Sequence, residues 1–164
     1  MHKFLLWQRI TIISIVIVDQ LTKYLVRRNF QLFESKPIFS FLSLTYIQNT
    51  GIAFGMFQNE QYSNIFFIFV SIGIIFGMYI WYEKILYYGR NLAQTGVSLI
   101  YAGAIGNLID RIIFGKVIDF IDLHFWPVFN IADSSITIGG IILFLSFCRF
   151  SRESPLHPPF SNVD

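Results

Sequence analysis

The sequence predicts an all-α membrane protein in which four transmembrane helices carry a small β-structure at the membrane surface. Composition is the first observation, because 54% of the 164 residues are hydrophobic and 13% are charged, against about 25% charged residues in a soluble domain. Second, charges are absent from long stretches of the chain, which leaves windows suited to lipid. Third, the segment PIFSFLSLTYIQ between the first two windows is aromatic and partly alternating, a pattern typical of strands.

Four apolar windows define the predicted spans of a single integral domain, residues 1–150. The spans are expected at about residues 8–26, 62–82, 91–112 and 134–150. The first window contains Lys23, whose long side chain is expected to reach the membrane surface. The charge-free part of the fourth window, residues 134–148, has 15 residues, fewer than the ~20 that a hydrocarbon core requires. Asp133 should therefore lie just inside one membrane surface.

The segments between the spans complete the predicted domain. Four spans place both termini on one side and segments 27–60 and 114–132 on the other. We expect β-structure within about residues 30–60, treat 114–132 as a loop, and predict that the Pro- and Ser-rich residues 151–164 form a disordered tail. Six Lys and Arg residues fall on each side, so the positive-inside rule leaves the orientation open.

Several chemistries find no support in the sequence. The net charge of +2 gives no reason to expect nucleic acid as a partner. The lone Cys148 builds neither a disulfide framework nor a cysteine metal site within one chain, and the three histidines are scattered, with no HExxH motif. GxSxG and P-loop motifs are also absent. We predict no cofactor and no metal.

Polar residues in or beside the spans form the candidate site, since ionisable groups in a span are costly. Asp19 and Lys23 are spaced i,i+4 and can form either a structural ion pair or a support for a nearby site. Asn49 in NTGIAFG is either the side chain of an Asx turn or an amide that binds substrate backbone. In GAIGNLIDR, Asn107 and Asp110 share one helical face.

Arg111, the last residue of GAIGNLIDR, has two possible partners. It can pair with an acid in the protein, which would be a structural role, or with lipid headgroups. The glycines of the same motif favour close helix packing.

Two further carboxylates, Asp119 in VIDF and Asp133 in FNIAD, have apolar neighbours and lie 14 residues apart. Each has an ordinary alternative, Asp119 as a loop acid and Asp133 as a helix N-cap. If the two approach each other, they cannot both ionise easily and would share a proton. Such a pair can hydrolyse a peptide bond, because one acid activates water while the other polarises the carbonyl.

Five motifs in order resemble those of bacterial lipoprotein signal peptidase, also called signal peptidase II, an intramembrane aspartic protease. They are DQLTK, NTGIAFG, GAIGNLIDR, GKVIDFID and FNIADSSITIG. The resemblance covers about residues 10–148 and depends on the order of the whole set, because each motif alone is weakly specific. It predicts a multi-pass protein of the bacterial inner membrane with both termini cytoplasmic, an extracytoplasmic β-cradle and an active site near the outer leaflet.

The resemblance also implies an activity. It implies cleavage of diacylglyceryl-modified prolipoproteins just before the lipidated cysteine, inhibition by globomycin-type compounds, and contact with membrane lipids. Separately, we expect a monomer. The catalytic residues it implies are Asp119 and Asp133. The residues with implied supporting or substrate-binding roles are Asp19, Lys23, Asn49, Gly51, Ala53, Asn107, Asp110, Arg111, Asn130 and Ala132. The stretch FIDLHFWPV between the two acids is shorter than in many family members. The resemblance therefore does not define the lid over the site.

Two other functions remain as alternatives. A proton-coupled transporter predicts acids near the membrane midplane and internal repeats, whereas here the acids gather towards one surface and no repeat is visible. A non-catalytic assembly subunit, whose polar residues hold helices together, predicts that single Asp→Asn changes damage folding rather than turnover.

Overall fold

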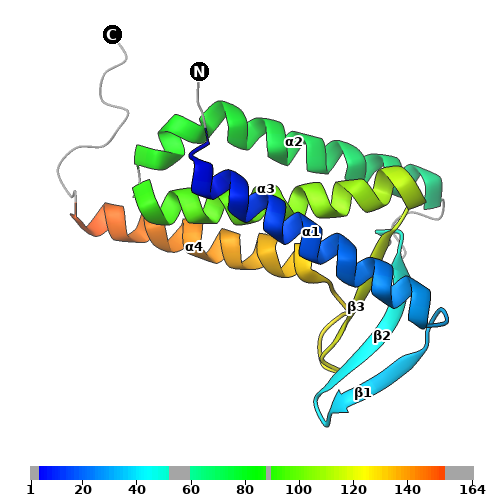
Figure 1. Cartoon of the computed structure of the whole chain (residues 1–164). Helices are drawn as coiled ribbons and strands as arrows, with labels where there is room; N and C mark the ends of the chain where they lie inside the picture. The colour runs from blue at the N-terminus through cyan, green and yellow to red at the C-terminus, as the bar shows by residue number, and fades with distance from the viewer. Residues whose placement is uncertain (1–3, 52–59, 88–89, 154–164) are drawn as a thin grey trace.

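The computed structural model describes residues 4–51, 60–87 and 90–153. Four helices lie side by side, and a small sheet extends from one end of the bundle (Figure 1). The helices are α1 (Leu6–Asn29), α2 (Glu60–Tyr87), α3 (Arg90–Phe114) and α4 (Ile131–Glu153). Helix α3 contacts each of the other three, while α1 begins and α4 ends at the end of the bundle away from the sheet.

Three of the helices are long and apolar enough to cross a membrane. These segments are Tyr62–Leu86, Asn91–Phe114 and Ile131–Phe150. Helix α1 has the length, with 24 residues, but every 18-residue stretch of it contains at least three charged residues. The prediction of a mostly helical membrane protein is confirmed, and length and composition support three of its four predicted spans.

The bundle places polar side chains inside and apolar side chains outside, as expected when lipid surrounds the helices. In α1, Ile10, Ile13 and Ile17 are each more than half exposed, whereas Asp19 and Lys23 are buried. A soluble helix would show the reverse pattern. The polar interior of this bundle is therefore where its function is to be sought.

Small residues bring α3 and α4 close together. A Cβ atom added at Gly96 would lie 2.8 Å from the carbonyl oxygen of Gly139, and one added at Gly103 would collide with the carbonyl oxygen of Ala132. Close backbone approach through glycine and alanine is typical of membrane helix pairs. This contact places the N-terminal turn of α4 directly against α3.

The sheet has three antiparallel strands in the order β1 (Ser35–Phe39), β2 (Leu42–Asn49) and β3 (Val117–Asp122). A two-residue turn joins β1 to β2, and β3 pairs with β2 in a register that sets Ile47 opposite Asp119. The predicted β-structure within residues 30–60 is thus confirmed, but the prediction that 114–132 is a loop is wrong for residues 117–122. Strand β3 forms because β2 offers it a partner.

An apolar cluster fixes the sheet to the bundle. Val26 near the end of α1, Tyr46 of β2, and Ile118 and Phe120 of β3 are all buried together. Because β3 is buried by this cluster along Val117–Phe120, its position relative to α1 is well defined. Asp119 lies in the middle of that buried stretch.

The described helices extend beyond the predicted spans at every end. The difference at α4 bears on the candidate site. This helix begins at Ile131 and not at residue 134, so Asp133 belongs to its first turn. Residues 151–153 continue α4, whereas 154–164, the rest of the predicted tail, and Ala53 lie outside the described residues.

Candidate active site

Asp119 and Asp133 meet where β3 and α4 come together, and Asn130 connects them. The side-chain amide of Asn130 donates to Asp119 Oδ1 at 2.7 Å, and its backbone N–H donates to Asp133 Oδ2 at 3.3 Å. The backbone N–H of Asp133 donates back to Asn130 Oδ1 at 2.8 Å. The two acids that the sequence separates by 14 residues thus contact the same asparagine.

The bonds between Asn130 and Asp133 form a capping box at the start of α4. Asn130 is the N-cap residue and Asp133 is the third residue of the helix. The alternative that Asp133 is itself the N-cap is therefore wrong, although Asp133 does accept an N–H bond at this helix end. The positive end of the helix dipole also favours a negative charge at this position.

Asp119 is almost fully enclosed, with 1% of its surface exposed. Burial raises the pKa of its carboxyl to about 6, and the nearby charge of Asp133 acts in the same direction. Hydrogen bonds from Asn49 and Asn130 oppose the shift. An acid with this pKa can hold or release a proton near neutral pH, which is what acid–base chemistry requires.

Asn49 forms the Asx turn that was one of its two sequence alternatives, and its amide also contacts Asp119. Its amide Nδ2 donates to Asp119 Oδ2 at 2.9 Å, while its Oδ1 accepts the backbone N–H of Gly51 at 2.7 Å in an Asx turn. The turn fixes which end of the amide faces Asp119. The contact recorded here is with the carboxylate, and substrate binding by Asn49 stays a prediction.

Gly51→Ala should impair this turn. Gly51 has φ +83°, and an added Cβ would collide with the ring of Phe67, so we expect a loss of about 1–3 kcal/mol together with a roughly tenfold loss of activity as Asn49 shifts. Thermal melting and a cleavage assay would measure the two effects. Gly115→Ala is the control, because it has φ +73° but open space around it. Equal losses of activity in both variants would contradict a specific role for the Asn49 turn.

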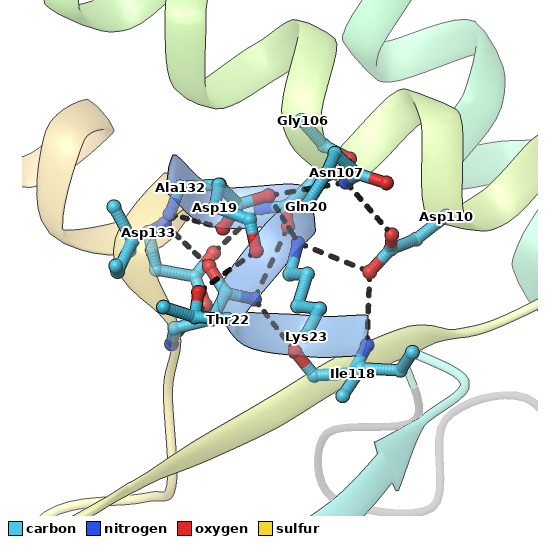
Figure 2. A network of polar contacts seen from close by, with 12 residues as sticks. Asp19, Gln20, Thr22, Lys23, Gly106, Asn107, Asp110, Ile118, Ala132 and Asp133 are labelled. Atoms are coloured by element: carbon cyan, nitrogen blue, oxygen red, sulfur yellow. Dashed lines mark hydrogen bonds and ion pairs between the residues drawn. The ribbon is translucent and has the colours of Figure 1, made fainter. Parts of the chain in front are cut away.

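A buried ion network adjoins Asp133 (Figure 2). Lys23, 1% exposed, contacts Asp19 Oδ2 at 2.8 Å and Asp110 Oδ2 at 3.0 Å. Its third contact is Asn107 Oδ1 at 3.1 Å, and the Asn107 amide donates to Asp133 Oδ1 at 2.7 Å. The predicted i,i+4 pair of Asp19 and Lys23 is therefore present, as part of a larger cluster.

The network also reaches the backbone beside each candidate acid. Asp110 Oδ2 accepts the N–H of Ile118 at 3.1 Å, immediately before Asp119. Asp19 Oδ1 accepts the N–H of Ala132 at 2.9 Å, immediately before Asp133. Ala132 itself is fully buried against Gly103 and Gly106.

An acid in the protein is one of the two partners that the sequence leaves open for Arg111, but Asp110, its neighbour in the chain, is not that partner. Asp110 pairs with Lys23 instead, because its side chain points inwards towards α1. The Arg111 guanidinium lies 5.1 Å from the centroid of the Phe67 ring, and Asp133, Asp119 and Asp110 all attract its charge. A half-buried cation beside two acids is placed to influence their charge.

Sequence reasoning missed Gln20, which donates to both Asp19 and Asp110. The cost of placing a charge in a span singles out ionisable groups, and Gln20 is neutral. Its position between Asp19 and Lys23 in an otherwise apolar run was the available signal. Each of the other candidate residues in the described part of the chain lies in or beside this cluster.

The fold and the site together define a helical membrane protein with a buried acid–amide centre at the sheet end of its bundle. The chain belongs to the signal peptidase II family, because the family model described as "Signal peptidase (SPase) II" matches residues 11–149. The resemblance drawn from the five motifs is thereby confirmed.

Individual relatives agree with this assignment. The lipoprotein signal peptidase of Geobacter metallireducens is 43% identical over 149 residues, which cover 88% of this chain and 91% of the relative. That of Halothermothrix orenii is 42% identical over 137 residues, covering 83% and 91%. A solved bacterial membrane enzyme, determined by the in meso method at 2.3 Å resolution, has a TM-score of 0.81 and 31% identity and covers 100% of this chain and 99% of its own.

Proposed function

We propose that this chain is a membrane aspartic endopeptidase that cleaves diacylglyceryl-modified prolipoproteins just before the lipidated cysteine. Membership of the signal peptidase II family accounts for the removal of signal peptides from prolipoproteins. The aspartic mechanism depends on one observation, that Asp119, with a pKa of about 6, contacts Asp133 through Asn130. Globomycin-type compounds are expected to compete for this site, and the enzyme is expected to act as a monomer without a cofactor.

The two acids divide the chemistry between them. The ionised acid takes a proton from water while the water oxygen attacks the scissile carbonyl carbon, and the protonated acid donates to the carbonyl oxygen. The tetrahedral intermediate then collapses: the acid that took the water proton donates it to the leaving nitrogen, the C–N bond breaks, and the carbonyl re-forms as its O–H proton returns to the other acid. The raised pKa of Asp119 suits it to hold the proton, and the helix N-terminus at Asp133 suits that residue to the ionised role.

The position of the site matches a lipidated substrate. The candidate acids lie at the sheet end of the bundle (Figure 1). If this end faces the outer leaflet, acyl chains on the substrate cysteine can remain in the bilayer while the peptide bond reaches the acids and water. Exposed aromatic residues near this end, Phe39 and Phe41 in the β1–β2 hairpin and Trp126 beyond β3, suit the membrane interface.

We assign α1 as a membrane span in addition to α2, α3 and α4, with both termini cytoplasmic in the bacterial inner membrane. Two of its charges, on Asp19 and Lys23, are buried inside the protein, so lipid does not meet them. The side chains that α1 exposes between these charges and its start include Ile10, Ile13 and Ile17. A helix whose charges are internally paired can cross a bilayer.

The function is tested with a purified protein and two substrates. A diacylglyceryl-modified prolipoprotein should be cut before its modified cysteine, as measured by the masses of the two products. The same prolipoprotein with an unmodified cysteine should be cut far more slowly, because it lacks the acyl chains. Equal cleavage of both, or a cut elsewhere, would contradict the proposed substrate class.

The pH dependence of cleavage should follow the shared proton. Because the active pair holds one proton and the pKa of Asp119 is about 6, kcat/KM should decline as pH rises above about 6, when that proton is lost. It should also decline at low pH, when both acids become protonated. The profile is measured with the lipidated substrate in detergent, and a rate that is flat between about pH 4 and 8 would contradict a shared-proton pair.

A further inference from the structure

The side chain of Gln20 occupies the centre of the buried network, although it carries no charge. Its Nε2 lies 3.2 Å from Asp19 Oδ2, 3.0 Å from Asp110 Oδ1 and 3.1 Å from the carbonyl oxygen of Gly106. One amide group thus connects α1, which carries Gln20 and Asp19, to α3, which carries Asp110 and Gly106 (Figure 2).

Lys23 cannot replace this amide. An ammonium group has three donors, and all three are used, on Asp19, Asp110 and Asn107. Asp110 Oδ1 therefore depends on Gln20. An ammonium is also a compact charge on a flexible stem, whereas a planar amide restricts the orientation of the carboxylates that it contacts.

The orientation of these carboxylates decides where the candidate acids lie. Asp110 holds the N–H of Ile118 and Asp19 holds the N–H of Ala132, each one residue before a proposed catalytic aspartate. Gln20 contacts both carboxylates. Rotation of either would release one N–H and allow β3 or α4 to shift.

We propose that Gln20 is a positioning residue that, by fixing the Asp19 and Asp110 carboxylates, sets the separation of Asp119 and Asp133. This inference rests on the proposed function. Gln20 contacts Asp19, Asp110 and Gly106 and not the two proposed catalytic acids, so its effect should fall on the chemical step through their positions. A misplacement of about 1 Å can cost about 100-fold in rate.

Gln8 provides a matched control in the same helix. It is fully buried at the opposite end of α1 and donates to Gln94 O at 3.4 Å and Ser98 Oγ at 3.3 Å. Tyr82 donates its hydroxyl proton to Gln8 Oε1 at 2.9 Å. Gln8 therefore ties the helices together as Gln20 does, but away from the two acids.

The experiment compares purified full-length wild type, Gln20→Met, Gln20→Asn and Gln8→Met with the lipidated substrate. We expect Gln20→Met to lower kcat about 10- to 100-fold with KM unchanged within about twofold. Gln20→Asn keeps the amide but shortens the side chain by one methylene group, so it should lose part of this activity. Gln8→Met should lower the melting temperature while kcat stays near wild type.

The outcomes separate this inference from the proposed function. Near-wild-type kcat in both Gln20 variants would overturn the positioning role, and so would equal losses of kcat in Gln8→Met and Gln20→Met. Failure of both Gln20 variants to fold would also overturn it, because the amide would then be a purely structural tie. Asp119→Asn and Asp133→Asn are included, and full activity in those variants would instead overturn the proposed mechanism.

Discussion

Replacement of either Asp119 or Asp133 by asparagine is expected to reduce cleavage about 10²- to 10⁴-fold, the range for loss of a general acid or base. Asparagine has nearly the shape of aspartate, but it can neither accept a proton from water nor carry one to the carbonyl oxygen. The shared proton of the pair disappears in both variants. Initial rates with the lipidated prolipoprotein measure the effect.

The two variants should also show a moderate loss of stability. Both oxygens of Asp119 accept amide protons, from Asn49 and Asn130. Neither amide is free to turn, since Gly51 and Asp133 hold their oxygens. An asparagine at position 119 would place its own NH₂ group against the NH₂ group of Asn49 or Asn130. This should lower the free energy of unfolding by about 1–3 kcal/mol, so thermal melting must accompany the rate measurements.

Asp122→Asn is the control for this prediction. Asp122 is on the same strand and accepts hydrogen bonds from Thr45 Oγ1 and the backbone N–H of His124, but it lies outside the acid–amide centre. We expect its variant to cleave at close to the wild-type rate. If Asp119→Asn or Asp133→Asn folds normally and cleaves at that rate, the affected acid is not catalytic. If both fail to fold, the alternative of an assembly subunit gains support.

The apolar spans could be predicted from the sequence because a lipid-exposed helix requires a long run of residues without charge. Runs without charge such as Asn91–Ile109 are long and continuous, and the structure has helices at each of them. The strand at Val117–Asp122 has no comparably clear pattern in its own sequence. Its residues alternate weakly, and it exists because β2, about 70 residues earlier in the chain, pairs with it. Pairing over such a separation cannot be read from a single segment.

The start of α4 can be predicted from the sequence, but the predicted span begins three residues too late, at residue 134 and not at Ile131. A lone aspartate before an apolar run, such as Asp133, suggests an N-cap. Asn130, three residues earlier, is the better cap because an acid at the third position can bond back to it. The pattern in FNIAD contains both residues, and recognising it would have placed Asp133 inside the first turn.

The buried network could be predicted in its members but not in its pairing. Asp19 and Lys23 share a helical face, so their contact follows from spacing. The contact of Lys23 with Asp110 joins α1 to α3, and it depends on how the two helices are rotated about their axes. The same rotation turns Asp110 away from Arg111. Sequence alone left that rotation undetermined.

Lys23→Met is expected to be among the most destabilising single substitutions in the bundle. It removes the ammonium that Asp19 and Asp110 share and leaves two buried carboxylates facing each other. Breaking a buried pair in this way costs about 3–5 kcal/mol, because desolvation persists after the attraction is gone. We therefore expect a melting temperature lower by about 10 °C or more, with loss of cleavage as the amides of Ile118 and Ala132 are released.

Lys36→Met is the matched control, because Lys36 is exposed and pairs with Glu34 at 3.2 Å on the sheet. Solvent screens that pair, so its variant should melt close to wild type. Adding Asp19→Asn to Lys23→Met removes one of the two unpaired charges and should recover part of the lost stability, since neighbouring substitutions are not additive. A Lys23→Met protein that melts and cleaves like wild type would contradict the network as the support of the two acids, and would leave the capping box of α4 as their main constraint.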